Sequence, residues 1–107
     1  MITRFAIFEG TINAGQDEEF RAAVKAEILP HWLSFPGARD VRLSFTEEAD
    51  EGAPSIPMIL QIDYDDMAAV DAALASPERG AAKAATENLL PRFFTGRIHH
   101  HITTKVV

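Results

Sequence analysis

The order in which strand-like and helix-like segments follow one another constrains this fold most. Apolar and polar residues alternate in Val41–Thr46 and in Ile56–Tyr64, which is the period of a β-strand. Phe20, Val24 and Ile28 recur instead at helical spacing, after an apolar first segment. With a second helical region and a last segment rich in β-branched residues, the order is strand, helix, strand, strand, helix, strand.

Local signals predict where these elements begin and end. We expect strands over Ile2–Glu9, Val41–Thr46, Ile56–Tyr64 and Arg97–Val107. Pro30 is expected to end or kink the first helix. The second helix should be broken near Ser76, because Ser76 and Pro77 are a typical N-cap and first helical position. It should then run to about Leu90, before a break at Pro91–Gly96.

The pattern predicts a single domain, residues 1–107, of the α+β class. Its expected form is a ferredoxin-like βαββαβ fold with a four-stranded antiparallel sheet. Two helices cover only one face of such a sheet, so the partly apolar second face predicts a homodimer.

Composition excludes several classes of function. A formal net charge of -6 argues against a nucleic-acid partner, and the absence of cysteine excludes disulfides and thiolate chemistry. The chain shows neither a signal-like start nor an apolar run long enough to span a membrane. We therefore expect a cytoplasmic protein with no membrane partner.

Three consecutive histidines in the expected last strand are the first candidates for catalysis. Strand alternation places His99 and His101 together, facing the space enclosed by a dimer, and His100 on the opposite face beside the helices. Neutral imidazole accepts a proton near pH 7, so at least one of them could act in proton transfer. The alternative is a row of histidines on a partly wet strand. No metal is expected, because no third ligand occurs at a diagnostic spacing.

Three further residues could border a small-molecule pocket. His31 and Trp32 follow the kink at Pro30 and could bind substrate, although a lone tryptophan is more often a core anchor. The hydroxyl of Tyr64 could donate to a carbonyl or phenolate in catalysis, or it could cap a sheet edge.

Arg42 and Gln61 lie in the polar registers of their strands. They could bind substrate, but the favoured interpretation is a salt-bridge and hydrogen-bond network with Asp63. No GxGxxG, P-loop or GxSxG motif is present, so no nucleotide or flavin cofactor is expected.

Three segments carry a resemblance to known proteins: Ile56–Tyr64, Ala72–Arg79 and Gly96–His101. With the strand order, they make the chain similar to the dimeric α+β barrel superfamily, and within it to the RedY-like and HapK-like proteins of prodiginine and bisindole pathways. The resemblance implies a homodimer with a small-molecule pocket in each subunit. It implies a cofactor-independent enzyme of bacterial secondary metabolism that cyclises or condenses an aromatic pyrrolic or indolic intermediate by histidine proton transfer.

Two other functions and two positions for the pocket remain open. The chain could be a cofactor-free monooxygenase of aromatic substrates or a non-catalytic ligand-binding module. His99 or His101 would act in a pocket inside the barrel, and His100 in a pocket between the sheet and the helices.

Overall fold

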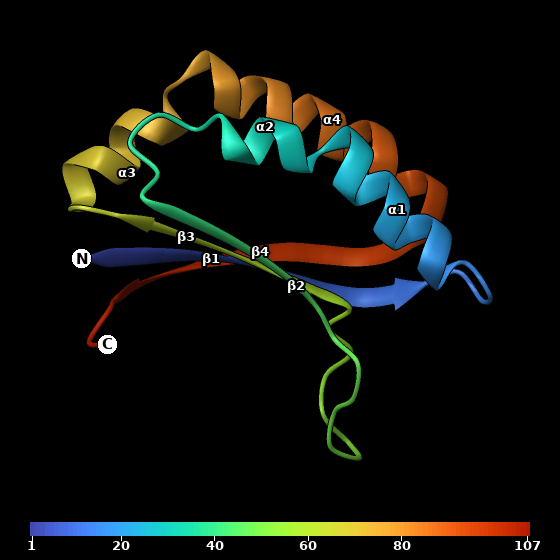
Figure 1. Ribbon diagram of the computed structural model, residues 1–107. Helices are drawn as coiled ribbons and strands as arrows, with labels where there is room; N and C mark the ends of the chain where they lie inside the picture. Colours follow the sequence, from blue (N-terminus) through green and yellow to red (C-terminus); the bar gives the residue numbers. More distant parts are fainter.

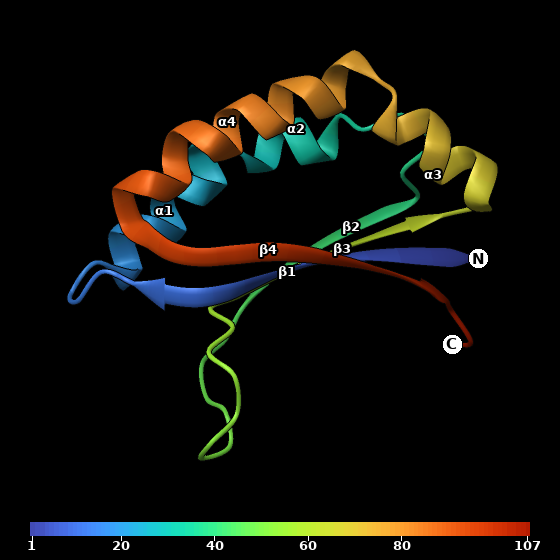
Figure 2. The same cartoon turned by 180° about the vertical axis from the view of Figure 1, so that it is seen from behind.

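The computed structural model describes residues 1–107 and contains eight helices and strands in all. They are β1 (Ile2–Ile12), α1 (Asp17–Glu27), α2 (Leu29–Leu33), β2 (Asp40–Phe45), β3 (Met58–Tyr64), α3 (Met67–Leu74), α4 (Pro77–Phe93) and β4 (Phe94–Thr104). The strands form one antiparallel sheet in the order β2-β3-β1-β4. Every helix lies on the same face of this sheet, and the other face is uncovered (Figures 1 and 2). The expected ferredoxin-like α+β architecture is confirmed.

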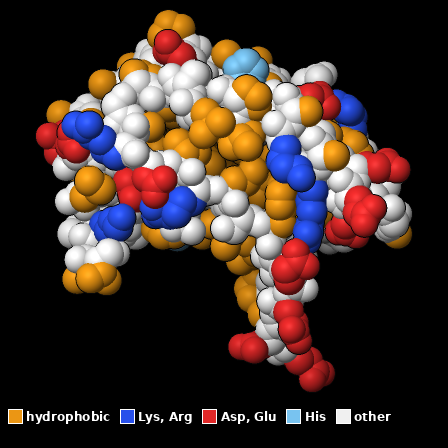
Figure 3. Space-filling view, viewed as in Figure 1, with side chains coloured by type: hydrophobic (Ala, Val, Ile, Leu, Met, Phe, Trp, Pro, Cys, Tyr) orange, Lys and Arg blue, Asp and Glu red, His pale blue; other side chains and the backbone are white.

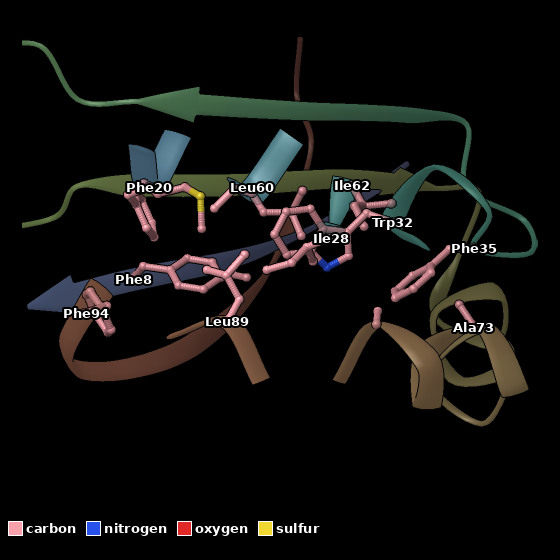
Figure 4. Packing of buried hydrophobic residues seen from close by; sticks show 14 of the residues in the cluster. Phe8, Phe20, Ile28, Trp32, Phe35, Leu60, Ile62, Ala73, Leu89 and Phe94 are labelled. Atoms are coloured by element: carbon pink, nitrogen blue, oxygen red, sulfur yellow. The ribbon is translucent and has the colours of Figure 1, made fainter. Parts of the chain in front are cut away.

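Alternation along the strands separates a helix-facing side from an uncovered side. In β3, Met58, Leu60, Ile62 and Tyr64 are all buried beneath the helices. Each large apolar side chain buried in this way stabilises the fold by about 1.5–3 kcal/mol. Figure 4 shows residues from both layers interleaved between the sheet and the helices. The core is therefore a single layer on one side of the sheet.

The two parts of the second helical region begin with side-chain caps. Asp66 accepts a hydrogen bond from the backbone N–H of Ala69 at 2.9 Å, which starts α3. Ser76 accepts one from Arg79 at 3.2 Å, with Pro77 in the first turn, which starts α4. The predicted break near Ser76 is confirmed. None of the helices combines the length and apolar sequence that a membrane span requires.

The end of α4 differs from the prediction. We expected Pro91–Gly96 to break the helix, but α4 continues through Pro91 to Phe93. Pro91 removes one helical hydrogen bond, but Phe93 is buried in the core and its packing keeps the last turn helical. The last strand consequently begins at Phe94 and ends at Thr104.

The first strand also runs further than predicted, through Gly10 to Ile12. Gly10 pairs with Gly96 of β4 at a very close approach of the two backbones. A Cβ atom on Gly10 would lie 2.7 Å from the Cα atom of Gly96 and would overlap the carbonyl oxygen of Thr95. Glycine here allows close strand pairing and does not end the strand.

Residues 46–57 form an arm that leaves the sheet on the side opposite the helices (Figure 1). The backbone N–H of Thr46 donates to Pro57 at 3.0 Å, which closes the base of the arm. Acidic side chains cover much of its length (Figure 3). Because of this arm, β3 begins at Met58 and not at Ile56.

Candidate functional site

A cavity of about 220 Å³ lies between the sheet and helix α4. Ala6 and Leu60 contribute to its floor from β1 and β3, and Ala82 contributes from α4. Lys83 and His100, both exposed, belong to α4 and to the edge strand β4, and they mark the mouth between these elements. The cavity is smaller than the roughly 300–1,000 Å³ of most drug-sized ligand sites, so it suits a molecule of one or two rings.

Aromatic side chains form one wall of this cavity. Phe8, Trp32 and Phe35 are buried in the layer between sheet and helices and line the cavity (Figure 4). The rings of Phe8 and Trp32 meet edge to face, with centroids 6.3 Å apart. Trp32 lies on the short helix α2, which contains Pro30 in its first turn and is separate from α1. The helix breaks at Ile28, two residues before Pro30, and the new helix α2 places the only tryptophan at the cavity.

His100 is the histidine that lines the cavity. It pairs with Ala6 of β1, and both lie in the register that faces the helices. Desolvation by the surrounding atoms, together with the positive charges of Arg4 and Arg79, lowers the pKa of His100 to about 4. The imidazole is therefore neutral at pH 7 and can accept a proton.

Two guanidinium groups share the cavity with His100. Arg4 comes from β1 and Arg79 from the first turn of α4, and both are half-buried. Burial lowers the pKa of Arg4, and the charge of Arg79 acts in the same direction. Glu87 is the only acidic residue among those that line the cavity.

The structure separates the eight residues that the sequence singled out. His100 and Trp32 line the cavity. Tyr64 lies in the core with 1% of its surface exposed, and burial raises the pKa of its hydroxyl. His31 lies on α2 but does not line the cavity. The other four lie on the uncovered face of the sheet: His99, His101, Arg42 and Gln61.

A polar network on the uncovered face is centred on Asp63, whose surface is only 1% exposed. Its carboxylate accepts hydrogen bonds from Arg42 at 3.0 and 3.2 Å, from Thr3 at 2.6 Å and from Lys105 at 2.9 Å. Arg42 also donates to Gln61 at 3.3 Å. The Arg42 guanidinium, with Thr3 and Lys105, holds the pKa of Asp63 well below its usual range. The predicted network of Arg42, Gln61 and Asp63 is confirmed.

His99 and His101 form a second polar group on the same face. Nδ1 of His99 lies 2.9 Å from Nε2 of His101, and Nε2 of His99 lies 3.1 Å from Oε1 of Glu9. A carboxylate only accepts, so a neutral His99 donates from Nε2 and accepts from His101 at Nδ1. No group of three or more histidine, aspartate or glutamate side chains is arranged to hold a metal ion.

Sequence reasoning missed the two arginines of the cavity. Arg4 shares its strand register with Ala6 and Phe8, which face the helices. Arg4 could have been found from the sequence, because it is a charged residue in a strand register that is otherwise apolar. The sequence gives a weaker indication for Arg79, because only the packing of α4 on the sheet shows that this residue faces the cavity.

Comparisons with solved structures show that the fold is shared. An ethyl tert-butyl ether d (EthD) family protein from Bacillus halodurans matches with a TM-score of 0.79 and 16% identity over 99% of both chains. A dimeric protein of unknown function with a ferredoxin-like fold, from Bacteroides fragilis, matches with a TM-score of 0.62 and 12% identity over 95% of this chain and 93% of that one. A variant of SnoaB, a cofactor-independent oxygenase from Streptomyces nogalater, matches with a TM-score of 0.63 and 18% identity over 99% of this chain and 93% of that one.

These likenesses place the chain in the class of ferredoxin-like α+β folds. No protein-family model matches the chain, and no curated protein sequence matches it.

Replacing Asp63 tests the polar network of the uncovered face. Asp63→Asn should lower the free energy of unfolding at pH 7 by about 1.5–3 kcal/mol, because it removes charged hydrogen bonds at a buried position. The folded-state pKa of Asp63 is depressed, so its stabilisation is present above the unfolded value near 3.9 and is lost as the pH falls towards the folded value. Urea denaturation at pH 7 and pH 3 should therefore show a smaller difference between variant and wild type at pH 3.

Asp65→Asn is the matched control, because the ion pair of Asp65 with Arg39 is exposed at both ends. It should change stability little at either pH. A constant difference between Asp63→Asn and wild type across this pH range would contradict the interpretation of the network.

Proposed function

We propose that this chain is a small-molecule enzyme in which His100 takes a proton from an electron-rich aromatic substrate. The observation that carries the proposal is the cavity between the sheet and α4, where a neutral imidazole stands beside a wall of Phe8, Trp32 and Phe35. Such a wall holds a planar ring, and a base at the rim can then remove an acidic proton from it. Trp32 is thus proposed as a substrate-binding residue and His100 as the catalytic base.

The favoured reaction is oxygenation by O₂ without a bound cofactor. His100 takes a proton from an activated CH₂ group, and the resulting carbanion reduces O₂. In the balanced reaction, CH₂ and O₂ become C=O and H₂O, so the carbon is oxidised, and His100 returns its proton to the departing water. The fold shared with SnoaB, a cofactor-independent oxygenase, supports this choice over other proton-transfer reactions.

Cyclisation or condensation of a pyrrolic or indolic intermediate is the second candidate. It needs the same proton abstraction but consumes no O₂. The size of the cavity favours it as well, because about 220 Å³ suits a one- or two-ring heterocycle. The resemblance of the sequence to RedY-like and HapK-like proteins supports a role for such an intermediate in bacterial secondary metabolism.

We also propose that the chain forms a homodimer through the uncovered face of the sheet. Phe5, Ile7 and Ile59 are half-buried there between polar networks, which is an unfavourable surface to leave in water. The protein of similar fold from Bacteroides fragilis is dimeric. In such a dimer, His99 and His101 would face the partner, whereas each cavity would belong to one subunit.

Turnover of an aromatic substrate tests the catalytic role of His100. Purified, chelator-treated protein should consume O₂ with an electron-rich bicyclic substrate that carries an activated CH₂ group, and His100→Gln should reduce kcat by about 10²–10⁴-fold. His99→Gln is the control, because His99 lies on the other face of the same strand and should keep near wild-type kcat. Product formation without O₂ uptake would favour cyclisation, and full activity of His100→Gln would refute its role as the base.

The pH dependence of turnover gives a second test of the same residue. A base must be unprotonated to act, and the pKa of His100 is lowered to about 4. We expect kcat/KM to stay level from pH 8 to about pH 5 and to fall only below that, in contrast to an ordinary histidine near 6.5. An acid limb that begins near pH 6.5 would contradict the assignment.

Light scattering tests the dimer. Wild type should have twice the mass of the chain at micromolar concentration. Ile59→Glu, which places a charge in the middle of the uncovered face, should be a folded monomer. Ala81→Glu, at an exposed position of α4, is the control and should remain dimeric. A monomeric wild type would overturn this proposal.

A further inference from the structure

Two arginines of the cavity differ from every other arginine in the chain. Each of the others has a carboxylate oxygen within 3.5 Å: Arg21 with Glu47, Arg39 with Asp65, Arg42 with Asp40 and Asp63, Arg92 with Glu27, and Arg97 with Glu9. Arg4 and Arg79 have no carboxylate within the 4.0 Å limit of an ion pair, and their guanidinium groups donate no hydrogen bond to protein. The two arginines without a partner are the two that line the cavity.

This arrangement is not explained by a shortage of acidic residues. The chain has 16 aspartate and glutamate residues against 10 lysine and arginine residues. Arg4 and Arg79 are nevertheless half-buried and close enough for each charge to oppose the other. Partial burial of like charges without a partner costs stability, and an incoming anion would offset that cost.

The surroundings of the two groups fit an anion better than a cation. Lys83 adds a third positive side chain to the lining, and Glu87 is the only negative one. Arg4 extends from the sheet and Arg79 from the helix above it, so the two groups approach the cavity from both layers. A guanidinium presents paired N–H donors that match the two oxygens of a carboxylate.

We propose that Arg4 and Arg79 bind a carboxylate on the aromatic substrate, so that the enzyme acts on an aromatic acid. The inference rests on the proposed function only for the location of the site. The ring lies against Phe8, Trp32 and Phe35, and the carboxylate lies between β1 and the first turn of α4. The arginines are then specificity-determining residues, and His100 lies beside them.

A pair of ligands that differ only in charge tests the proposal. Isothermal titration of wild type should show that indole-2-carboxylate binds at least about tenfold more tightly than indole-2-carboxamide at low salt. Arg79→Gln and Arg4→Gln should each remove most of this preference while they retain binding of the carboxamide. Arg92→Gln is the matched control, because Arg92 lies on α4 outside the cavity and pairs with Glu27. It should keep the full preference.

Circular dichroism and thermal unfolding verify that the variants are folded. Equal affinity of wild type for the two ligands, no binding of either, or a preference that survives both substitutions would each overturn the proposal. The preference is measured without turnover, so it is independent of the reaction. If Arg79→Gln loses the preference but wild type takes up no O₂, the anion site is established and the oxygenase is refuted. If wild type turns over substrate but shows no preference for the carboxylate, the enzyme is supported and the anion site is refuted.

Discussion

The antiparallel pairing of β1 with β4 is the interaction on which the rest of this structure depends. It joins eleven residues of β1 to eleven of β4, from Ile2 with Thr104 to Ile12 with Phe94. Side chains alternate between the faces of a sheet, so the register decides which histidine faces the helices. A slip of one residue would move His100 to the uncovered face. The close approach at Gly10 and Gly96 favours the observed register.

Charged side chains on the two faces of the sheet differ in whether they have a partner of opposite charge. On the uncovered face, the buried carboxylate of Asp63 has three donor residues around it and is fully satisfied. On the helix-facing side, Arg4 and Arg79 have no such partner. A buried carboxylate that is fully hydrogen-bonded stabilises a structure, whereas half-buried like charges without a carboxylate partner cost stability. The second arrangement is therefore the one that calls for a ligand.

Local signals in the sequence predicted most of the architecture. The alternation in β3 and the cap at Ser76 depend on near neighbours, and the structure confirms both. The end of α4 differs from the prediction, because the tertiary packing of Phe93 in the core supports a turn that Pro91 weakens. The location of the cavity cannot be predicted from the sequence, since it depends on the space between α4 and the sheet, which no local pattern encodes. The sequence therefore indicated which residues share a face, but it did not indicate which face holds a cavity.

The proposed anion site and the proposed base are coupled by electrostatics. The charges of Arg4 and Arg79 contribute to the lowered pKa of His100, so the imidazole of the free protein is a weak base. A carboxylate between the arginines would offset much of that positive field and raise the proton affinity of the imidazole. The arginines would also stabilise negative charge that develops on the ring as the proton leaves. Binding of an aromatic acid would thus strengthen the base only when the substrate is in place, and a neutral analogue of the same shape would leave it weak.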